Sequence, residues 1–378
     1  RSRGLGDVYK RQDGIRSNSA TSDAITLASN GTCTANITNN LSNRNLIING
    51  AMNVAQRGTS STSSGYATLD RFRLAVANTD QAAYTQKQVS DSPDDFSQSY
   101  EFDVTTAETS LDSNEYAFIG HRIEAQNLQS VKANQVTLSF YVKAYQTGTY
   151  AINIYQQDGN IHITKTYTIS QSGTWEKKTL TFAANTGTQP NNDNGFGWEI
   201  AWIMAAGSGV KSSDSTSWGT YSDAGFAFGQ GVNVLSSTNN YFKITGVQLE
   251  VGSVATDFEH RSYGQELALC QRYYQLIVPR DSNENPIGIF YTNASVMFCL
   301  VALKTTMRAT PTLDISNYTN AFRAYGSSGV NHSTVSLNTG CTDTIMLQAN
   351  GDSGTAGYLR LFAQDGGQRA KIAVNAEL

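Results

Sequence analysis

Between about Asn45 and Glu259 the sequence repeats short runs in which apolar and polar residues alternate, separated by Gly, Asn, Ser and Thr. In the run VTLSFYVK, Val136, Leu138 and Phe140 alternate with Thr, Ser and Tyr neighbours. An alternation with a period of two residues is typical of a half-buried β-strand. No run with helical spacing interrupts it. This pattern predicts that the region is all-β.

About ten such runs are separated by turn residues and no crossover helix lies between them, which predicts an antiparallel β-sandwich of the jelly-roll kind. The tripeptide QTG, which lies between two of the runs, is predicted to be a hairpin loop. The runs are DRFRLAVA, AYTQKQV, SYEFDVT, YAFIGHRIEA, VTLSFYVK, YAINIYQ, HITKTYTI, WEKKTLTF, FGWEIAWIMA and YFKITGVQLEV.

One helix is expected over residues 262–276. Ser262 followed by Gln265 fits a capping box, and Glu266 places a negative charge in the first turn, where it suits the helix dipole. Pro279 would end the helix. Its apolar residues project onto roughly half of the circumference, so one face is expected to be buried; they are Leu267, Leu269, Cys270, Tyr273, Tyr274 and Leu276.

After Pro279 the strand pattern returns, in runs such as VMFCLVALK, TIMLQAN and KIAVNAEL, and predicts a second, smaller β domain. A chain of 378 residues is long enough for two domains. Residues 1–12 resemble the spurious translated end of an assembled reading frame. The predicted organisation is then a stalk or linker at 13–44, the jelly-roll domain at 45–259, a linking helix at 260–278 and a C-terminal β domain at 279–378.

Charge and hydropathy exclude several classes of partner. The net charge is −4 and the 27 Lys and Arg are spread along the chain, so no basic patch indicates a nucleic acid or an anionic membrane surface. No apolar segment approaches the 18 or so residues that span a bilayer, and the basic start has no apolar region after it. The sequence predicts no membrane insertion, no signal peptide and no nucleic-acid partner.

No motif in the sequence demands catalysis. The four histidines are scattered, and neither HExxH nor GxSxG occurs. The run NNDNG fails the calcium-loop pattern, because Pro190 and Ala201 stand at its first and last ligand positions. We therefore predict no enzyme activity, no cofactor and no metal site.

Aromatic residues are the candidates for ligand binding. The long polar loop 207–231 carries Trp218 and Tyr221, whose rings suit stacking on sugars or on a partner surface. The alternative is that these rings fold back and close an end of the sandwich. Trp198 and Trp202 share a strand face with Phe196; such an apolar face suits a core, but also the concave face on which jelly-roll proteins carry sugar-binding tryptophans. The candidate glycan-binding residues are Trp218, Tyr221, Trp202 and Trp198.

Two stretches of the chain carry a family resemblance: it starts at NLIINGAMNVAQRG and is sharpest at YFKITGVQLEVGSVATDFEHRSYGQELALCQRYYQ. Through them the chain resembles a family of bacteriophage tail-fibre proteins from marine and environmental phages. Residues 45–259 also resemble jelly-roll carbohydrate-binding modules, through the opening NLIxNG and a closing strand that ends in VQLE. Such modules often carry Asp-Asp in the closing strand and bind a structural calcium, whereas this chain has Thr245 and Gly246 there.

The resemblance implies a virion protein that binds a bacterial surface glycan or another host receptor, contacts other phage tail or baseplate proteins, and forms a homotrimer. The helix would then lie near the threefold axis, with Leu269, Tyr273 and Leu276 as candidate contacts between chains, or else pack on its own chain. Two alternatives to this adhesin stay open. One is a secreted bacterial carbohydrate-binding module, and the other is a capsule depolymerase.

Overall fold

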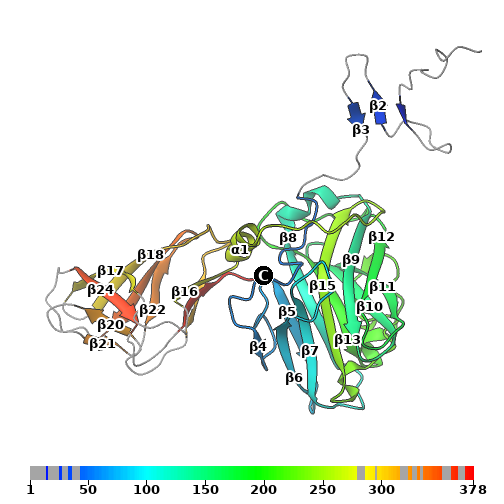
Figure 1. Ribbon diagram of the computed structural model, residues 1–378, viewed down its shortest axis with the longest axis horizontal. Helices are drawn as coiled ribbons and strands as arrows, with labels where there is room; N and C mark the ends of the chain where they lie inside the picture. The colour runs from blue at the N-terminus through cyan, green and yellow to red at the C-terminus, as the bar shows by residue number, and fades with distance from the viewer. Residues whose placement is uncertain are drawn as a thin grey trace, which may run out of the picture.

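The computed structural model describes residues 43–278, 296–315, 335–350 and 371–378, together with the backbone of seven short strands outside these ranges. Figure 1 shows a β-sandwich joined, through the single α-helix of the described residues, to a smaller group of strands. The seven strands are β1 (Gly14–Ile15), β2 (Ile25–Leu27), β3 (Cys33–Ala35), β17 (Pro286–Asn293), β20 (Phe322–Tyr325), β21 (Val330–His332) and β24 (Leu359–Gln364).

Two six-stranded antiparallel sheets form the sandwich and confirm the predicted fold class. The first, which we call the β13 sheet, has the order β14-β11-β10-β13-β8-β5 and contains β5 (Phe72–Ala77), β8 (Tyr116–Glu124), β10 (Gly148–Gln156), β11 (Ile161–Ile169), β13 (Phe196–Ala206) and β14 (Gly219–Thr220). The second, the β15 sheet, has the order β12-β9-β15-β7-β6-β4 and contains β4 (Ser60–Ser61), β6 (Ala83–Val89), β7 (Ser99–Thr106), β9 (Val136–Ala144), β12 (Glu176–Phe182) and β15 (Tyr241–Val251).

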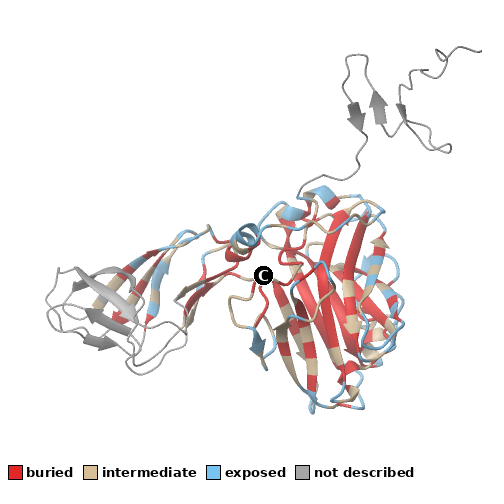
Figure 2. Cartoon of the chain, viewed as in Figure 1, coloured by how far each residue is buried: buried red, intermediate tan, exposed pale blue. Residues whose placement is uncertain are grey.

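The core lies between the two sheets, where the buried strand faces meet (Figure 2). Val136, Leu138, Phe140 and Val142 all point into it from β9, as their alternation predicts. Burial of one such side chain stabilises the fold by about 1.5–3 kcal/mol relative to its exposure. All ten predicted runs form strands; the short 3₁₀ helices η2 (Ala125–Val131) and η5 (Val234–Ser236) lie in two of the connections between them.

The predicted hairpin at QTG is wrong. β9 pairs with β12 and β15, whereas β10 pairs with β11 and β13, so residues 145–147 cross from one sheet to the other. Tyr150 of β10 consequently faces Phe242 of β15 across the core, with 5.6 Å between the ring centroids. Alternation shows which face of a strand is buried, but it does not show which strand pairs with it.

The helix α1 (Tyr263–Gln271) is shorter than predicted. Its capping box is confirmed, because the Gln265 backbone N–H donates to Ser262 Oγ and the Gln265 side chain accepts from the Ser262 N–H. The chain then leaves the helix and forms β16 (Tyr274–Val278), which pairs with β25 (Ile372–Asn375). The distant strand overrides the local helical pattern. Among the described helices, none has the length and apolar character to cross a bilayer.

The chain beyond α1 forms two further sheets. Strand β25 lies between β16 and β19 (Thr312–Ile315) in one of them. The other has the order β21-β20-β24-β17-β18-β23-β22, with β18 (Val296–Ala302), β22 (Ser336–Gly340) and β23 (Thr344–Asn350). A second hydrophobic cluster, which includes Ile345, Leu347 and Val374, supports this part. These sheets agree with the predicted all-β class; the domain boundaries stay predictions.

Residues 371–378 return to the sandwich and hold the two parts together (Figure 1). Glu377 forms ion pairs with Arg57, at 3.1 Å, and with the fully buried Arg71. The Arg71 guanidinium also lies 3.4 Å from the ring centroid of Tyr273. On the other side of the junction, Arg272 binds the Glu124 carboxylate at 2.7 and 2.9 Å. Charged groups therefore connect the sandwich to the residues that follow β25 and to the residue that follows α1.

Candidate functional site

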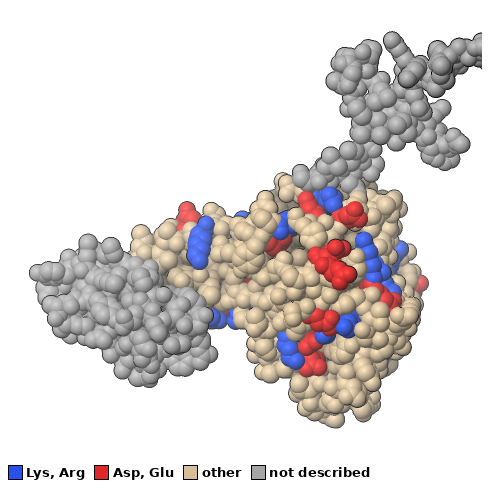
Figure 3. Space-filling view, in the orientation of Figure 1, with Lys and Arg blue, Asp and Glu red and all other residues tan. Residues whose placement is uncertain are grey.

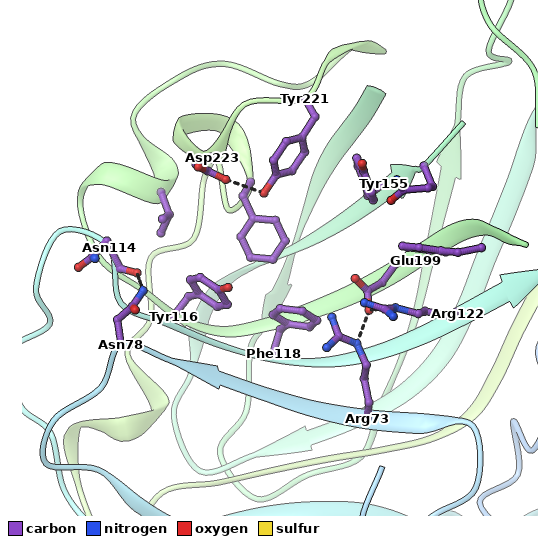
Figure 4. Close-up of a pocket in the computed structure, with 14 residues that line it drawn as sticks. Arg73, Asn78, Asn114, Tyr116, Phe118, Arg122, Tyr155, Glu199, Tyr221 and Asp223 are labelled. Carbon is purple, nitrogen blue, oxygen red and sulfur yellow. Dashed lines mark hydrogen bonds and ion pairs between the residues drawn. The ribbon is translucent and has the colours of Figure 1, made fainter. Parts of the chain in front are cut away.

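A cleft of about 550 Å³ opens on the face of the β13 sheet that points away from the core. Strands β5, β8, β10 and β13 supply its floor, and the loop 207–231 supplies one wall (Figure 4). Its lining combines aromatic rings with charged and amide side chains: Arg73, Asn78, Asn114, Tyr116, Phe118, Arg122, Tyr155, Gln157, Phe196, Glu199, Val210, Tyr221, Asp223 and Phe226.

A β-bulge in β13 decides which side chains enter the cleft. Phe196 and Trp198 pair with successive residues of β8, so Gly197 is an extra residue between them. The extra residue turns Phe196 to the same side as Glu199, and the prediction that Phe196 shares a face with Trp198 is wrong. A side chain does not fit at Gly197, because its Cβ would lie 2.7 Å from Ala125 Cα.

The floor of the cleft carries two arginines and one carboxylate. Arg73 Nε donates to Glu199 Oε1 at 2.5 Å, and Arg122 Nε donates to the same oxygen at 3.1 Å. Arg122 Nη1 also donates to the backbone oxygen of Leu378 at 2.5 Å. Gly120 leaves room for this group, since a Cβ there would lie 2.9 Å from Glu199 Oε1. Two guanidinium groups therefore share one carboxylate oxygen on the floor, and Arg122 has a second acceptor in Leu378.

Six aromatic side chains stand around this floor. The ring of Tyr155 lies 5.0 Å from that of Tyr221 and 6.0 Å from that of Phe196. A second group, at 5.3 to 5.9 Å between centroids, consists of Tyr116, Phe118 and Phe226. Rings in such groups hold one another in place and present apolar faces with polar edges.

The loop 207–231 is packed onto the sheet along its length. It contains η3 (Gly209–Lys211), β14 and η4 (Asp223–Gly225). The Tyr221 N–H donates to the Asn160 carbonyl at 2.8 Å, and the Thr164 N–H donates to the Ser215 carbonyl at 2.7 Å. Phe226 belongs to a small hydrophobic cluster between the loop and the sheet. The wall of the cleft is therefore held in place by contacts with the sheet.

Tyr221 of this wall and the neighbouring His162 of β11 act as neutral hydrogen-bonding groups near pH 7. Tyr221 donates its hydroxyl to Asp223 Oδ1 at 2.9 Å (Figure 4). Burial, and then the neighbouring Asp223, raise the pKa of Tyr221 above its ordinary value. Burial lowers the pKa of His162, whose ring lies 5.0 Å from that of Tyr221. Tyr221 therefore stays protonated and His162 stays uncharged.

The structure separates the four predicted glycan-binding residues. Trp202 is fully buried and Trp198 is 3% exposed, so both belong to the core and their prediction as ligand contacts is corrected. Trp218 is half-buried, with its ring 5.7 Å from that of Trp198, and closes the edge of the core. Tyr221 alone lines the cleft. The two tryptophans of β13 occupy the inward positions of the strand, and the cleft is on the opposite side.

The three predicted contacts between chains also differ in position. Tyr273 is 1% exposed and packs against Arg71 of its own chain, so its prediction as a contact with another chain is corrected. Leu276 lies in β16, opposite Ala373, and not on the helix. Leu269 is 37% exposed on α1 and remains a predicted contact.

Sequence reasoning missed the charged floor and all of the aromatic lining except Tyr221. Arg73, Tyr155 and Glu199 stand at the outward positions of three strands, where a polar or amphipathic residue is unremarkable. Their grouping depends on the strand order β10-β13-β8-β5. Large aromatic and charged residues at outward positions of several strands are a signal only after that order is known.

One group of acids among the described residues has the spacing of a metal site. Asp80, Glu108 and Glu115 bring one carboxylate oxygen each within 4.8 Å of the others. Glu108 and Glu115 are buried and Asp80 is exposed. Oxygen ligands of this kind suit a hard divalent cation.

The closing-strand positions at which similar modules carry a pair of acids do not fit a calcium ion. Thr245 uses its hydroxyl to donate to the Gln98 carbonyl at 2.7 Å. Gly246 has φ of 60°, and a Cβ there would lie 2.6 Å from Cζ of Phe96. An aromatic ring therefore takes the space that a carboxylate would need.

No protein family and no curated protein matches the chain by sequence. Among solved structures, the chain is similar to a putative sugar-binding protein from Bacteroides thetaiotaomicron, at 13% identity and a TM-score of 0.35, over 55% of this chain and 100% of that one. It is similar to a family 11 carbohydrate-binding module of a Clostridium thermocellum cellulase, at 11% identity and a TM-score of 0.28, over 54% and 98%.

A third similar structure is the enzymatically active domain of tailspike protein 4 from bacteriophage CBA120, at 15% identity and a TM-score of 0.32. The match covers 55% of this chain and only 22% of the tailspike chain. At these TM-scores the likeness is distant and assigns no function.

Proposed function

We propose that the chain is a glycan-binding adhesin without catalysis of its own, and that a bacteriophage tail fibre carries it to the bacterial surface. The observation that carries the proposal is the cleft on the β13 sheet, in which aromatic rings surround a floor of fixed hydrogen-bonding groups. Its volume of about 550 Å³ suits a small ligand or a short stretch of a polymer.

The chemistry of the cleft suits a sugar. A pyranose ring has apolar C–H faces and a belt of hydroxyl groups, so it needs both apolar platforms and polar partners. Tyr155, Tyr221 and Phe196 supply the platforms. Glu199, Asp223 and the two floor arginines supply acceptors and donors at fixed positions.

The tail-fibre part of the proposal rests on the sequence block around α1. A fibre of this kind is expected to be a homotrimer, and light scattering after gel filtration of the full chain measures the particle mass directly. Three chains per particle support the fibre. A monomer at micromolar concentration would contradict it and would favour the secreted module.

Glycan binding is tested with purified surface polysaccharides and two cleft variants, Tyr155→Ala and Tyr221→Ala. An aromatic contact contributes about 0.5–1.5 kcal/mol, so each change is expected to weaken binding by about 2- to 12-fold. Tyr145→Ala is the matched control, because Tyr145 is 47% exposed and lies outside the cleft. If both cleft variants bind as tightly as the wild type and the control, the cleft is not the glycan-binding site. If the protein releases new reducing ends from the polysaccharide, it is a depolymerase and not an adhesin without catalysis.

A further inference from the structure

The floor of the cleft contains a guanidinium group that is only half used. Arg73 Nε donates to Glu199 Oε1, and no other hydrogen bond of this guanidinium to the described residues exists. A guanidinium has two edges that bind a carboxylate through two parallel hydrogen bonds, one that includes Nε and one formed by Nη1 and Nη2. Glu199 occupies the Nε side. The Nη1 and Nη2 edge is left for a ligand.

The position of Arg73 holds that edge ready. Its guanidinium carbon lies 5.1 Å from the ring centroid of Phe118, and its side chain is 20% exposed. Figure 4 shows the terminal nitrogens beside Phe118 and Glu199, among the residues that line the cleft. A guanidinium fixed by a ring and by a carboxylate loses little freedom when it binds.

The arrangement of donors and acceptors across the cleft also favours an anion beside Arg73. Glu199 Oε1 is shared by Arg73 and Arg122, and Arg122 has a second acceptor in the Leu378 oxygen, whereas the terminal nitrogens of Arg73 have no acceptor among the described residues. The other acid of the cleft, Asp223, stands on the loop wall and accepts from Tyr221. On the face of the molecule that Figure 3 draws, positive and negative side chains lie close to one another.

We propose that the cleft selects acidic glycans, and that Arg73 binds the carboxylate of a uronic acid residue through its Nη1 and Nη2 edge. This inference rests on the proposed glycan binding and names its ligand class. The two-nitrogen edge forms two parallel hydrogen bonds with a carboxylate, as it does with a tetrahedral oxyanion, so the experiment below includes a sulfate polymer as the alternative. Asp223, on the wall, orients the sugar because it repels the sugar carboxylate and accepts hydrogen bonds from the sugar hydroxyl groups.

The test uses the full chain and matched polymers. The probes are polygalacturonate, alginate and hyaluronan, each beside its carboxyl-reduced form, which keeps the sugar backbone and loses the charge. Dextran sulfate supplies the second kind of anion. Affinities are measured by calorimetry per repeat unit, up to millimolar concentration, for the wild type, Arg73→Gln, Arg73→Lys and Lys177→Gln. Lys177 is the control, because it is an exposed cation on β12 of the other sheet.

The expected result is that at least one acidic polymer binds the wild type at least tenfold more tightly than its carboxyl-reduced form. Arg73→Gln abolishes that difference. Arg73→Lys keeps the charge but lacks the planar edge, so it retains only part of the affinity difference. Lys177→Gln behaves as the wild type. Matching melting temperatures show that the variants are folded.

Two kinds of failure are distinguishable. If carboxyl-reduced polymers bind as tightly as acidic ones, and Tyr155→Ala still weakens the binding of both, the proposed glycan binding stands and the proposed selectivity for acidic glycans is wrong. Equal binding of dextran sulfate, with the same dependence on Arg73, also overturns the carboxylate assignment. If no polymer, acidic or reduced, binds at millimolar concentration, this inference is overturned, and the proposed function then depends on the polysaccharide and tyrosine experiment above.

Discussion

Asp70 makes the stability of the protein depend on pH in an unusual direction. It is fully buried near the junction between the sandwich and β25. The Gln56 backbone N–H donates to Asp70 Oδ1 at 3.1 Å, the Gln56 amide donates to Oδ2, and Arg57 Nη1 lies 3.4 Å from Oδ1. Burial raises the pKa of Asp70 to about 7, and outweighs the opposing effects of Arg57 and Gln56.

The sign follows from the two end states. The pKa of Asp70 is about 7 in the folded chain and 3.8 as its ordinary value. Between these values the folded chain holds a proton that the unfolded chain has released. The stabilisation from this proton is complete below the unfolded pKa and is lost as the pH rises through the folded one. Between pH 5 and pH 8 the loss amounts to about 2.5 kcal/mol in the free energy of unfolding.

Asp70→Asn isolates this effect, because the neutral amide has the shape of the protonated acid and does not titrate. Urea unfolding of both proteins at pH 5, 6.5 and 8 gives the free energy of unfolding of each. In the difference between the two proteins, the contributions of the titrating groups that they share cancel. We expect the stability of the wild type relative to the variant to fall by about 2.5 kcal/mol from pH 5 to pH 8. A difference that is constant with pH, or that rises, would refute the reasoning.

Three further changes test other contacts. Glu377→Gln leaves the buried Arg71 without its anionic partner and is expected to lower the free energy of unfolding by about 3–5 kcal/mol in urea; a loss below about 1 kcal/mol would contradict the ion pairs. Trp218→Ala uncovers the edge of the core and is expected to lower the free energy of unfolding by about 2 kcal/mol, measured by thermal unfolding, without changing the affinity for glycans. A loss of affinity at an unchanged melting temperature would instead make Trp218 a ligand contact. Gly246→Asp forces a side chain into a positive φ against Phe96 and is expected to cost at least about 1–3 kcal/mol, with no rise in melting temperature on addition of calcium.

Much of the fold was predictable because its signals are local. Residues two positions apart, such as Val136 and Leu138, indicate which face of a strand is buried. The four residues from Ser262 to Gln265 indicate where α1 begins. The candidate site was less predictable. The loop aromatic Tyr221 was identified, but Trp198 and Trp202 were also candidates, because an apolar strand face looks the same in sequence whether it faces a core or a ligand.

The sequence by itself determined the strands, the cap of the helix and the polarity of each strand face, since each depends on neighbours within a few residues. The tertiary structure decided the order of the strands, the end of α1 at Gln271 and the turn of Phe196 toward Glu199. These depend on partners far away in the chain, such as β25 for the residues after the helix and β8 for the bulge at Gly197. The cleft exists only where such distant segments meet, which is why its charged floor emerged from the folded chain alone.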